Sequence, residues 1–301
     1  LLKKPDFSEK TMILQGQINE KNNLEKKKIS NLGDVEFSVF SQFGEDGIIS
    51  WLSNQLPDID KVFLEIGTQN YWESNTRFLL NSQNYKGYLV EASSIDVNEI
   101  KKQSIYWKKD LTVINEFVDC ENINSLIKKN LKSNKLGLLS LDIDGNDYWI
   151  LKEIDLEPDL IVCEYNSIFG DLHELTVPYD KNFNRSKKHY SNLFFGCSIK
   201  ALINLMEKKN YNFLGTNTQG MNAFFVNKNK QNYFDQKIVE KKIFFPTTRE
   251  GRNKSGKLNH KNIFENLNLI KDLQIYDLET KEIQKLSTYK NLYSDEWQMK
   301  F

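Results

Sequence analysis

Acidic side chains recur in this sequence at the points where short apolar stretches end. They are Glu65, Glu91, Asp119, Asp142 with Asp144, and Glu164. If these stretches are strands of an open parallel sheet, their carboxyl ends meet at one crevice and the carboxylates converge there. Any one of them alone is explained as well by a surface carboxylate. Glu91 follows Gly67 by 24 positions, close to the separation at which an acid after the second strand accepts both ribose hydroxyls. The joint placement predicts a nucleoside site.

The turn after the first apolar stretch bears on which nucleoside binds. A dinucleotide site favours G-x-G-x-x-G, because the backbone must approach a pyrophosphate closely. Here Gly67 is followed by Thr68-Gln-Asn-Tyr-Trp72, without a further glycine. S-adenosylmethionine has no phosphate and needs polar groups around its amino-acid end and its sulfonium. The turn therefore weakens the prediction of a nicotinamide cofactor and leaves a methyl donor open.

The elements that would position these acids alternate along the chain. Apolar, β-branched and aromatic runs predict strands over 62–66, 87–91, 113–118, 138–143, 160–164, 212–215 and 222–227. Helical patterns fall between them, over 74–82, 96–104, 122–131, 147–154 and 198–208. Strands that alternate with helices predict a doubly wound, Rossmann-like α/β fold with a mostly parallel sheet. The short spacer between the last two strands predicts an antiparallel edge hairpin, which completes seven strands.

Three regions follow from the pattern. Residues 1–40 are rich in Lys, Asn and Glu, and their sparse apolar positions have helical spacing. We expect a peripheral helix there, which could pack on a second subunit in a homodimer. A solvated arm is the alternative. Residues 41–230 form the Rossmann-like domain. Residues 231–301 are more polar and are interpreted as an extension packed on it.

Composition excludes several classes of function. Lys and Arg together number 41, as do Asp and Glu, so the chain lacks the positive field that nucleic-acid binding needs. No apolar run approaches the length of a membrane span, and the charged N-terminal residues do not resemble a signal peptide. We therefore expect a cytoplasmic protein. Cys120, Cys163 and Cys197 lie far apart in apolar stretches and predict inert thiols.

Several longer motifs resemble one known family. They are Phe40-Ser-Gln-Phe-Gly-Glu-Asp-Gly-Ile-Ile49, Phe63-Leu-Glu-Ile-Gly67, Glu73-Ser-Asn-Thr76, Leu141-Asp-Ile-Asp-Gly-Asn-Asp147, Cys163-Glu-Tyr-Asn166 and Asn222-Ala-Phe-Phe-Val226, together with Thr248-Arg-Glu-Gly-Arg252. They are similar to the FkbM-like branch of class I S-adenosylmethionine-dependent methyltransferases, over most of the chain. The glycine-poor turn after Gly67 departs from the family pattern.

The resemblance implies a cofactor site and an activity. Glu65 and Gly67 would hold the methionine end, Glu91 the ribose and Asp119 the adenine edge, while Gln42 would help close the site. The implied cofactor set also contains Asn75, Thr76, Ala92 and Asp142. The implied reaction is O-methylation of a sugar or other polar precursor of a bacterial surface glycan.

The acceptor side has several candidate catalytic groups. Asp144, Glu164 and Asn166 follow the fourth and fifth strands and offer oxygen donors for a magnesium ion, an arrangement that resembles metal-dependent O-methyltransferases. Direct base catalysis by Asp144 is the simpler rival. His173 is a candidate proton acceptor because an ordinary imidazole titrates near neutral pH.

Two further groups of residues are candidates for binding the acceptor. An insertion over 178–196 supplies aromatic and cationic side chains, namely Tyr179, Phe183, Arg185, Tyr190 and Phe194. Arg249 and Arg252 could bind a phosphate or carboxylate, or be ordinary surface charges. Two other functions stay open: a nicotinamide-dependent reductase and a non-catalytic nucleoside-binding module.

Overall fold

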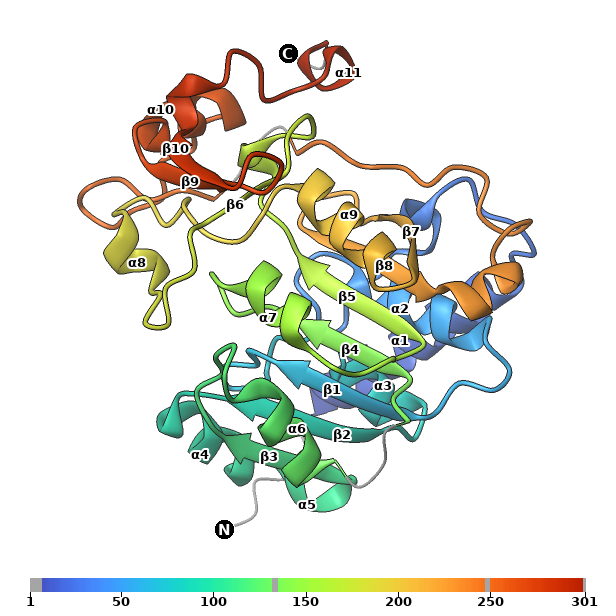
Figure 1. The fold of residues 1–301 in the computed structure, drawn as a ribbon. Coiled ribbons are helices and arrows are strands. Elements are labelled where there is room, and N and C mark those ends of the chain that lie inside the picture. Colours follow the sequence, from blue (N-terminus) through green and yellow to red (C-terminus); the bar gives the residue numbers. More distant parts are fainter. Residues whose placement is uncertain (1–6, 132–134, 247–249, 300–301) are drawn as a thin grey trace.

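The computed structural model describes residues 7–131, 135–246 and 250–299, and it contains a central seven-stranded sheet (Figure 1). The strands are Val62–Ile66 (β1), Lys86–Glu91 (β2), Leu111–Asn115 (β3), Leu138–Leu141 (β4), Leu160–Glu164 (β5), Tyr211–Thr216 (β7) and Asn222–Asn227 (β8). Their order across the sheet is β3-β2-β1-β4-β5-β8-β7. The strands from β3 to β5 are parallel, whereas β8 runs antiparallel to both β5 and β7. The predicted fold, including the edge hairpin, is confirmed.

The buried strands explain why the sheet is covered on both faces. Successive side chains of a strand point to opposite faces, so β1 contributes Leu64 and Ile66 to one apolar cluster and Phe63 to the other. The first cluster includes residues of Ile123–Asn130 (α6), Asp147–Glu153 (α7) and Ile199–Lys208 (α9). The second includes residues of Glu45–Asn54 (α2), Arg77–Ser82 (α3), Ser94–Lys102 (α4) and Ser104–Lys108 (α5). Figure 1 shows α6, α7 and α9 on the face turned to the viewer.

The strand order reverses between β1 and β4. The strand that follows β1 in the sequence, β2, lies on one side of the β1–β4 pair, and the strand that follows β4, β5, lies on the other side. Loops at the carboxyl ends of these strands separate there, and open α/β sheets bind their ligands in the resulting crevice. The predicted site therefore has a defined place in the fold.

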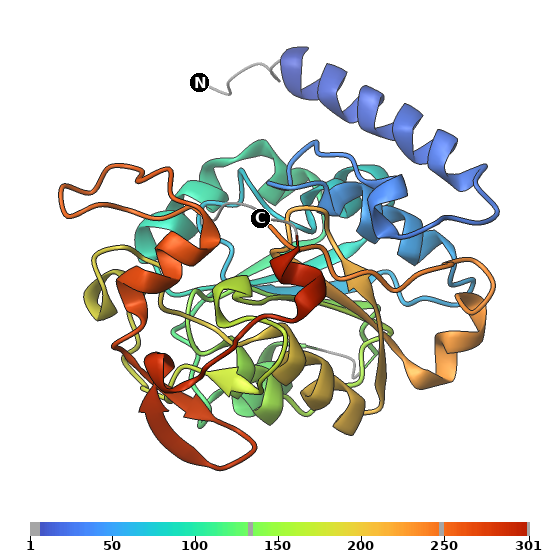
Figure 2. The same ribbon diagram turned by 90° about the horizontal axis from the view of Figure 1, so that it is seen from above.

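The N-terminal residues form the predicted helix, Phe7–Leu24 (α1), which lies along one side of the molecule (Figure 2). Gly16 faces inward, where an added Cβ would lie 2.6 Å from side-chain atoms of Phe78 and Val39. Met12, Leu14 and Ile18 are exposed on the outside. A homodimer that covers them stays a prediction. Among the described residues, no helix is long and apolar enough to cross a membrane.

The C-terminal residues share the core of the main sheet. Gln274–Asp277 (β9) pairs with Glu282–Lys285 (β10) and with Leu175–Thr176 (β6), which belongs to the chain after β5. Ile263–Ile270 (α10) and Asp295–Gln298 (α11) bury Ile263, Ile270 and Trp297 in the same cluster as α6, α7 and α9. The short elements that remain are Leu32–Val35 (η1), Ser167–Phe169 (η2), Arg185–Lys188 (α8), Lys228–Tyr233 (η3) and Leu286–Thr288 (η4). The boundaries at 40 and 230 stay predictions.

Candidate active site

A cavity of about 450 Å³ opens at the carboxyl ends of β1, β2, β4 and β5. A volume of this size is typical of small-molecule sites. Of the cofactor, catalytic and metal-binding residues predicted from the sequence, those that line it are Gln42, Glu65, Gly67, Asn75, Glu91, Ala92, Asp142, Asp144 and Glu164. These positions extend over more than a hundred residues of the chain. The structure therefore brings most of the predicted set together.

The turn after β1 passes very close to β4. Gly67 has φ +85°, and a Cβ built on it would lie 1.6 Å from the carbonyl oxygen of Asp142. Gln69 and Tyr71 also have positive φ, at 46° and 63°. The glycine-poor turn thus follows a left-handed path with non-glycine residues, which costs free energy that surrounding contacts must offset.

Glu91 supplies some of those contacts. Its Oε2 accepts hydrogen bonds from the backbone N–H of Thr68 at 3.1 Å and of Gln69 at 2.7 Å. Its Oε1 accepts from the N–H of Ser93 at 2.8 Å. Glu91 therefore fixes the turn and lines the cavity as well. Sequence spacing alone predicted only the second role.

Glu65 is held by the segment that precedes α3. Its carboxylate accepts from Ser74 Oγ at 2.8 Å, from the N–H of Asn75 at 3.0 Å and from Thr76 Oγ1. Burial raises the pKa of Glu65, while these hydrogen bonds act to lower it. Thr76 is fully buried behind Glu65 and is absent from the cavity wall, so we revise its role from cofactor contact to support. The same hydrogen bonds explain why α3 begins at Arg77 rather than at the predicted residue 74.

Three carboxylates cluster after β4 and β5. Oxygen atoms of Asp142, Asp144 and Glu164 all lie within 4.8 Å of one another. Burial and the neighbouring charge of Glu164 raise the pKa of Asp142 well above its ordinary value. Asp144, at φ 57°, forms an ion pair with Arg185. Such a cluster favours a shared proton or a bound cation.

Asn166 does not belong to that cluster, which corrects the predicted ligand set. Its Nδ2 donates to the carbonyls of Leu193 at 2.9 Å and Phe195 at 3.0 Å, and its Oδ1 accepts from the N–H of Ile168 at 3.1 Å. The side chain is fully buried and its polar atoms are engaged in holding loops. Asp142 takes its place beside Asp144 and Glu164.

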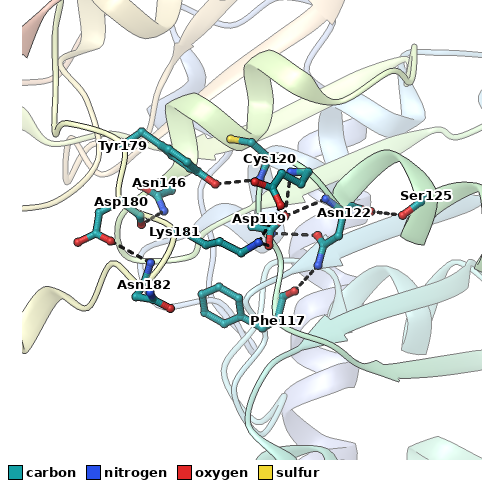
Figure 3. Close-up of polar contacts among 11 residues, drawn as sticks. Phe117, Asp119, Cys120, Asn122, Ser125, Asn146, Tyr179, Asp180, Lys181 and Asn182 are labelled. Atoms are coloured by element: carbon teal, nitrogen blue, oxygen red, sulfur yellow. Dashed lines mark hydrogen bonds and ion pairs between the residues drawn. The ribbon is translucent and has the colours of Figure 1, made fainter.

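Asp119 anchors a crossing segment instead of lining the cavity (Figure 3). Its Oδ1 accepts from the N–H groups of Glu121 and Asn122, both at 2.8 Å, at the start of α6. Its Oδ2 lies 2.9 Å from Lys181 Nζ. Burial acts to raise the pKa of Asp119, but the Lys181 ammonium and the neighbouring backbone N–H groups hold it below its ordinary value. The neighbouring Phe117 and Val118 line the cavity where Asp119 was expected.

The insertion over 178–196 crosses the cavity between the loops after β3 and β4. Tyr179 Oη accepts from the N–H of Cys120 at 3.3 Å, and Asn146 Nδ2 donates to the carbonyl of Asp180 at 2.8 Å, as Figure 3 shows. Phe183 and Arg185 line the cavity. Tyr179, Tyr190 and Phe194 were also predicted to bind the acceptor, and they lie outside the wall of the cavity.

His173 lies away from the site, so the structure gives it no contact with a reacting group there. Its ring is 4.8 Å from that of Tyr289, and its Nε2 is 2.8 Å from the carbonyl oxygen of Asn291. Arg249 lies outside the described residues. Arg252 is absent from the cavity wall, and its backbone N–H donates to the carbonyl of Ser191.

Several wall residues were missed by sequence reasoning. They include Glu45, Glu73, Glu116, Asn146, Asn222 and Glu250. Four of them, Glu45, Glu73, Asn146 and Asn222, lie inside the motifs quoted above, and Glu250 lies in the Thr248–Arg252 segment. The motifs therefore contained these residues, but the search for acidic residues at the ends of predicted strands did not select them. Glu45 is the clearest case, since it begins α2 and its buried Oε1 accepts from Asn217 and Asn222, both at 2.8 Å.

Asp46 holds the loop that contains Gln42, and its burial predicts a pH effect on stability. Its Oδ2 accepts from the N–H groups of Val39 and Phe40 at 2.6 Å and of Ser41 at 2.9 Å. Burial nevertheless raises its pKa from 3.8 to about 7. The native state then binds a proton that the unfolded chain has lost, so this contribution to stability is present below pH 4 and is lost as pH rises through about 7.

Between about pH 4 and pH 7, burial of Asp46 makes the free energy of unfolding fall as pH rises. We expect Asp46→Asn to reduce this fall by up to about 1.4 kcal/mol per pH unit. Urea unfolding at several pH values measures it, with the exposed Asp58→Asn as the matched control. An unchanged slope in Asp46→Asn would contradict the assignment.

Comparison with known proteins finds distant structural likenesses. No family model matches the sequence, and no curated protein does. An O-methyltransferase from Bacillus cereus in complex with SAH shares 16% identity over 73% of this chain and 90% of its own, with a TM-score of 0.40. An S-adenosylmethionine-dependent methyltransferase from Clostridium acetobutylicum shares 11% identity over 61% of this chain and 90% of its own, with a TM-score of 0.39. A putative O-methyltransferase from Klebsiella pneumoniae shares 12% identity over 72% of this chain and 90% of its own, with a TM-score of 0.38. Likenesses this distant support no statement about activity.

Proposed function

We propose that this chain is an S-adenosylmethionine-dependent methyltransferase that acts on a small polar acceptor. One observation supports it above the others, namely the charge of the cavity at the switch point of the sheet. Among the described residues of its wall, one is basic, Arg185, and nine are acidic. The acidic residues are Glu45, Glu65, Glu73, Glu91, Glu116, Asp142, Asp144, Glu164 and Glu250. A negative cavity suits a cofactor with a sulfonium and an ammonium group and disfavours a pyrophosphate.

The residues present fit this cofactor. Glu65 and Asn75, with the turn at Gly67, would hold its amino-acid end. The Glu91 carboxylate keeps one lone pair beyond those that accept from Thr68, Gln69 and Ser93, and it would accept one ribose hydroxyl. Ala92, Phe117 and Val118 would face the adenine in place of Asp119. Gln42 is exposed at the cavity and would cover the cofactor, as the sequence resemblance implies.

The bound cofactor would supply a methyl group activated by the sulfonium. Phe183 and Arg185 would position the acceptor beside Asp144 and Glu164. As the acceptor heteroatom bonds to the methyl carbon and the carbon–sulfur bond breaks, Asp144 or Glu164 would take the proton. His173 is not needed for this step.

A divalent cation is a rival arrangement within the same function. Asp142, Asp144 and Glu164 offer the carboxylate oxygens that magnesium prefers, and a cation would relieve the repulsion between them. Arg185 already neutralises part of that charge through Asp144. Methyl transfer that survives EDTA would favour direct proton transfer to the carboxylates. Activity that is lost with EDTA and restored by magnesium would favour the cation.

The finer assignment rests on the sequence resemblance. It favours a hydroxyl of a surface-glycan precursor as the acceptor, in a cytoplasmic enzyme.

Isothermal titration with S-adenosylmethionine tests the proposal. We expect saturable binding that Glu91→Gln weakens about 10- to 100-fold, because one charge-assisted acceptor is lost. Glu99→Gln, on the exposed side of α4, should leave the affinity unchanged. Absence of saturable heat would refute the proposal.

Two other functions give different results. A nicotinamide-dependent reductase would enhance the fluorescence of the reduced cofactor on mixing. A non-catalytic nucleoside-binding module would bind S-adenosylmethionine without transferring its methyl group to any acceptor.

A further inference from the structure

Three glutamates at the cavity lie away from the strand ends to which the cofactor contacts are assigned. Glu45 begins α2, Glu73 precedes α3, and Glu250 belongs to the segment after 246. They lie close enough that Glu45 and Glu250 both act electrostatically on Glu73, adding to burial in raising its pKa. We refer to Glu45, Glu73 and Glu250 as the glutamate cluster.

The basic residue of the wall does not neutralise this cluster. The guanidinium of Arg185 is paired with Asp144, its Nε donates to the carbonyl of Asn192, and its Cζ lies 3.9 Å from the ring centroid of Phe195. Among the described wall residues no other Lys or Arg is present. The cluster is therefore a region of negative charge without a basic partner in the wall.

A buried amide oxygen beside the cluster also has no partner. Asn222 is 7% exposed, its Nδ2 donates to Glu45 Oε1 at 2.8 Å, and its Oδ1 has no hydrogen-bond partner. Because Glu45 fixes which end of the amide donates, Oδ1 can only accept. Asn146 repeats the pattern: it is 5% exposed, its Nδ2 donates to Asp180, and its Oδ1 has no partner. An unpaired buried acceptor is costly, so both oxygens favour a ligand that donates hydrogen bonds.

We infer that the acceptor carries a protonated amine, which the glutamate cluster and the amide oxygen of Asn222 bind. This inference rests on the proposed function. The ammonium anchors one end of an aminated polyol, and a hydroxyl at the other end faces Asp144 and Glu164. That oxygen bonds to the methyl carbon, the carbon–sulfur electron pair stays on sulfur, and the hydroxyl proton passes to a carboxylate. Phosphorylated and nucleotide-linked sugars are disfavoured because their anions would meet an unneutralised negative wall.

Ligand titration tests the inference on protein loaded with S-adenosylhomocysteine. The probes are glucosamine, N-acetylglucosamine and glucose 6-phosphate, which share a ring and differ in charge. We expect glucosamine to bind at least tenfold more tightly than the other two, with an affinity that falls as salt rises. Glu73→Gln with Glu250→Gln should reduce that preference to less than threefold. Both side chains are exposed, so the double variant should fold, and Glu99→Gln with Asp58→Asn, two exposed positions outside the cavity wall, is the charge-matched control.

The outcomes separate this inference from the proposed function. Failure of S-adenosylhomocysteine to bind would count against the proposed function itself. Three results would overturn the inference alone, provided that the cofactor binds normally. They are equal affinity for glucosamine and N-acetylglucosamine, no binding of glucosamine, and a preference for glucose 6-phosphate. A preference for glucosamine that persists in the double variant would overturn the assignment to the glutamate cluster.

Discussion

Gly67→Ala is expected to abolish binding of S-adenosylmethionine and to lower the free energy of unfolding by about 2–6 kcal/mol. Two costs add. A non-glycine residue at φ +85° is strained by about 1–3 kcal/mol. The new methyl group would also lie 1.6 Å from the carbonyl oxygen of Asp142, and overpacking of this kind costs about 1–3 kcal/mol more. Since β1 and β4 are paired strands, the turn has to shift relative to Asp142, and the turn is where the methionine end would bind in the proposed function.

Gly256→Ala is the matched control for that change. Gly256 has φ +80°, nearly the same backbone conformation, but an added Cβ meets nothing within 4 Å. It should show the strain without the clash and leave cofactor binding intact. Denaturant unfolding and titration calorimetry on both variants measure the difference. Equal losses of stability, or retained cofactor binding in Gly67→Ala, would show that the close approach to Asp142 does not matter.

Gly67 illustrates what the sequence could predict about the site. A buried apolar run that ends in an acid and a glycine is a local signal, and so is the alternation of strands with helices. These signals predict a crevice at the strand ends, and the structure places Glu65, Glu91, Asp142 and Glu164 in the wall of one cavity there. They work because the side-chain period of a strand and the layered packing of α/β folds leave few arrangements open.

The failures share a different cause. Asp119 and Asn166 also follow strands, but each is engaged by partners distant in sequence, Lys181 for the first and the carbonyls of Leu193 and Phe195 for the second. His173 is held by Asn291, more than a hundred residues later. No local pattern indicates whether a polar side chain after a strand turns into the cavity or toward a crossing segment. That choice depends on long-range contacts.

Arg77 makes further long-range contacts, and it connects the N-terminal helix to the turn after β1. The side chain is 1% exposed at the start of α3. Its Nη1 donates to the carbonyl of Tyr71 at 2.7 Å and to Gln103 Oε1 at 2.6 Å, while its Nη2 lies 2.9 Å from Glu9 Oε1 in α1. The guanidinium also lies 4.7 Å from the ring centroid of Trp72. One buried cation thus holds the left-handed part of the turn and is neutralised by a residue from the N-terminal extension.

Glu9→Ala is therefore expected to destabilise the protein by about 3 kcal/mol, because it leaves Arg77 buried without a countercharge. This is the low end for a broken buried pair, since the Glu9 side chain is 30% exposed and water can replace part of the lost interaction. The exposed pair of Glu99 with Lys102 is the control, and Glu99→Ala should cost no more than about 0.5 kcal/mol.

A double-mutant cycle with Arg77→Leu separates the pair from its surroundings. Glu9→Ala should cost much less in the Arg77→Leu background, because the cation that needs neutralising has gone. Glu9→Ala alone should also weaken S-adenosylmethionine binding several-fold, since the carbonyl of Tyr71 would lose a firmly placed donor. If Glu9→Ala costs the same in both backgrounds, the helix stabilises the protein by apolar packing alone, and the link from α1 to the turn after β1 is refuted.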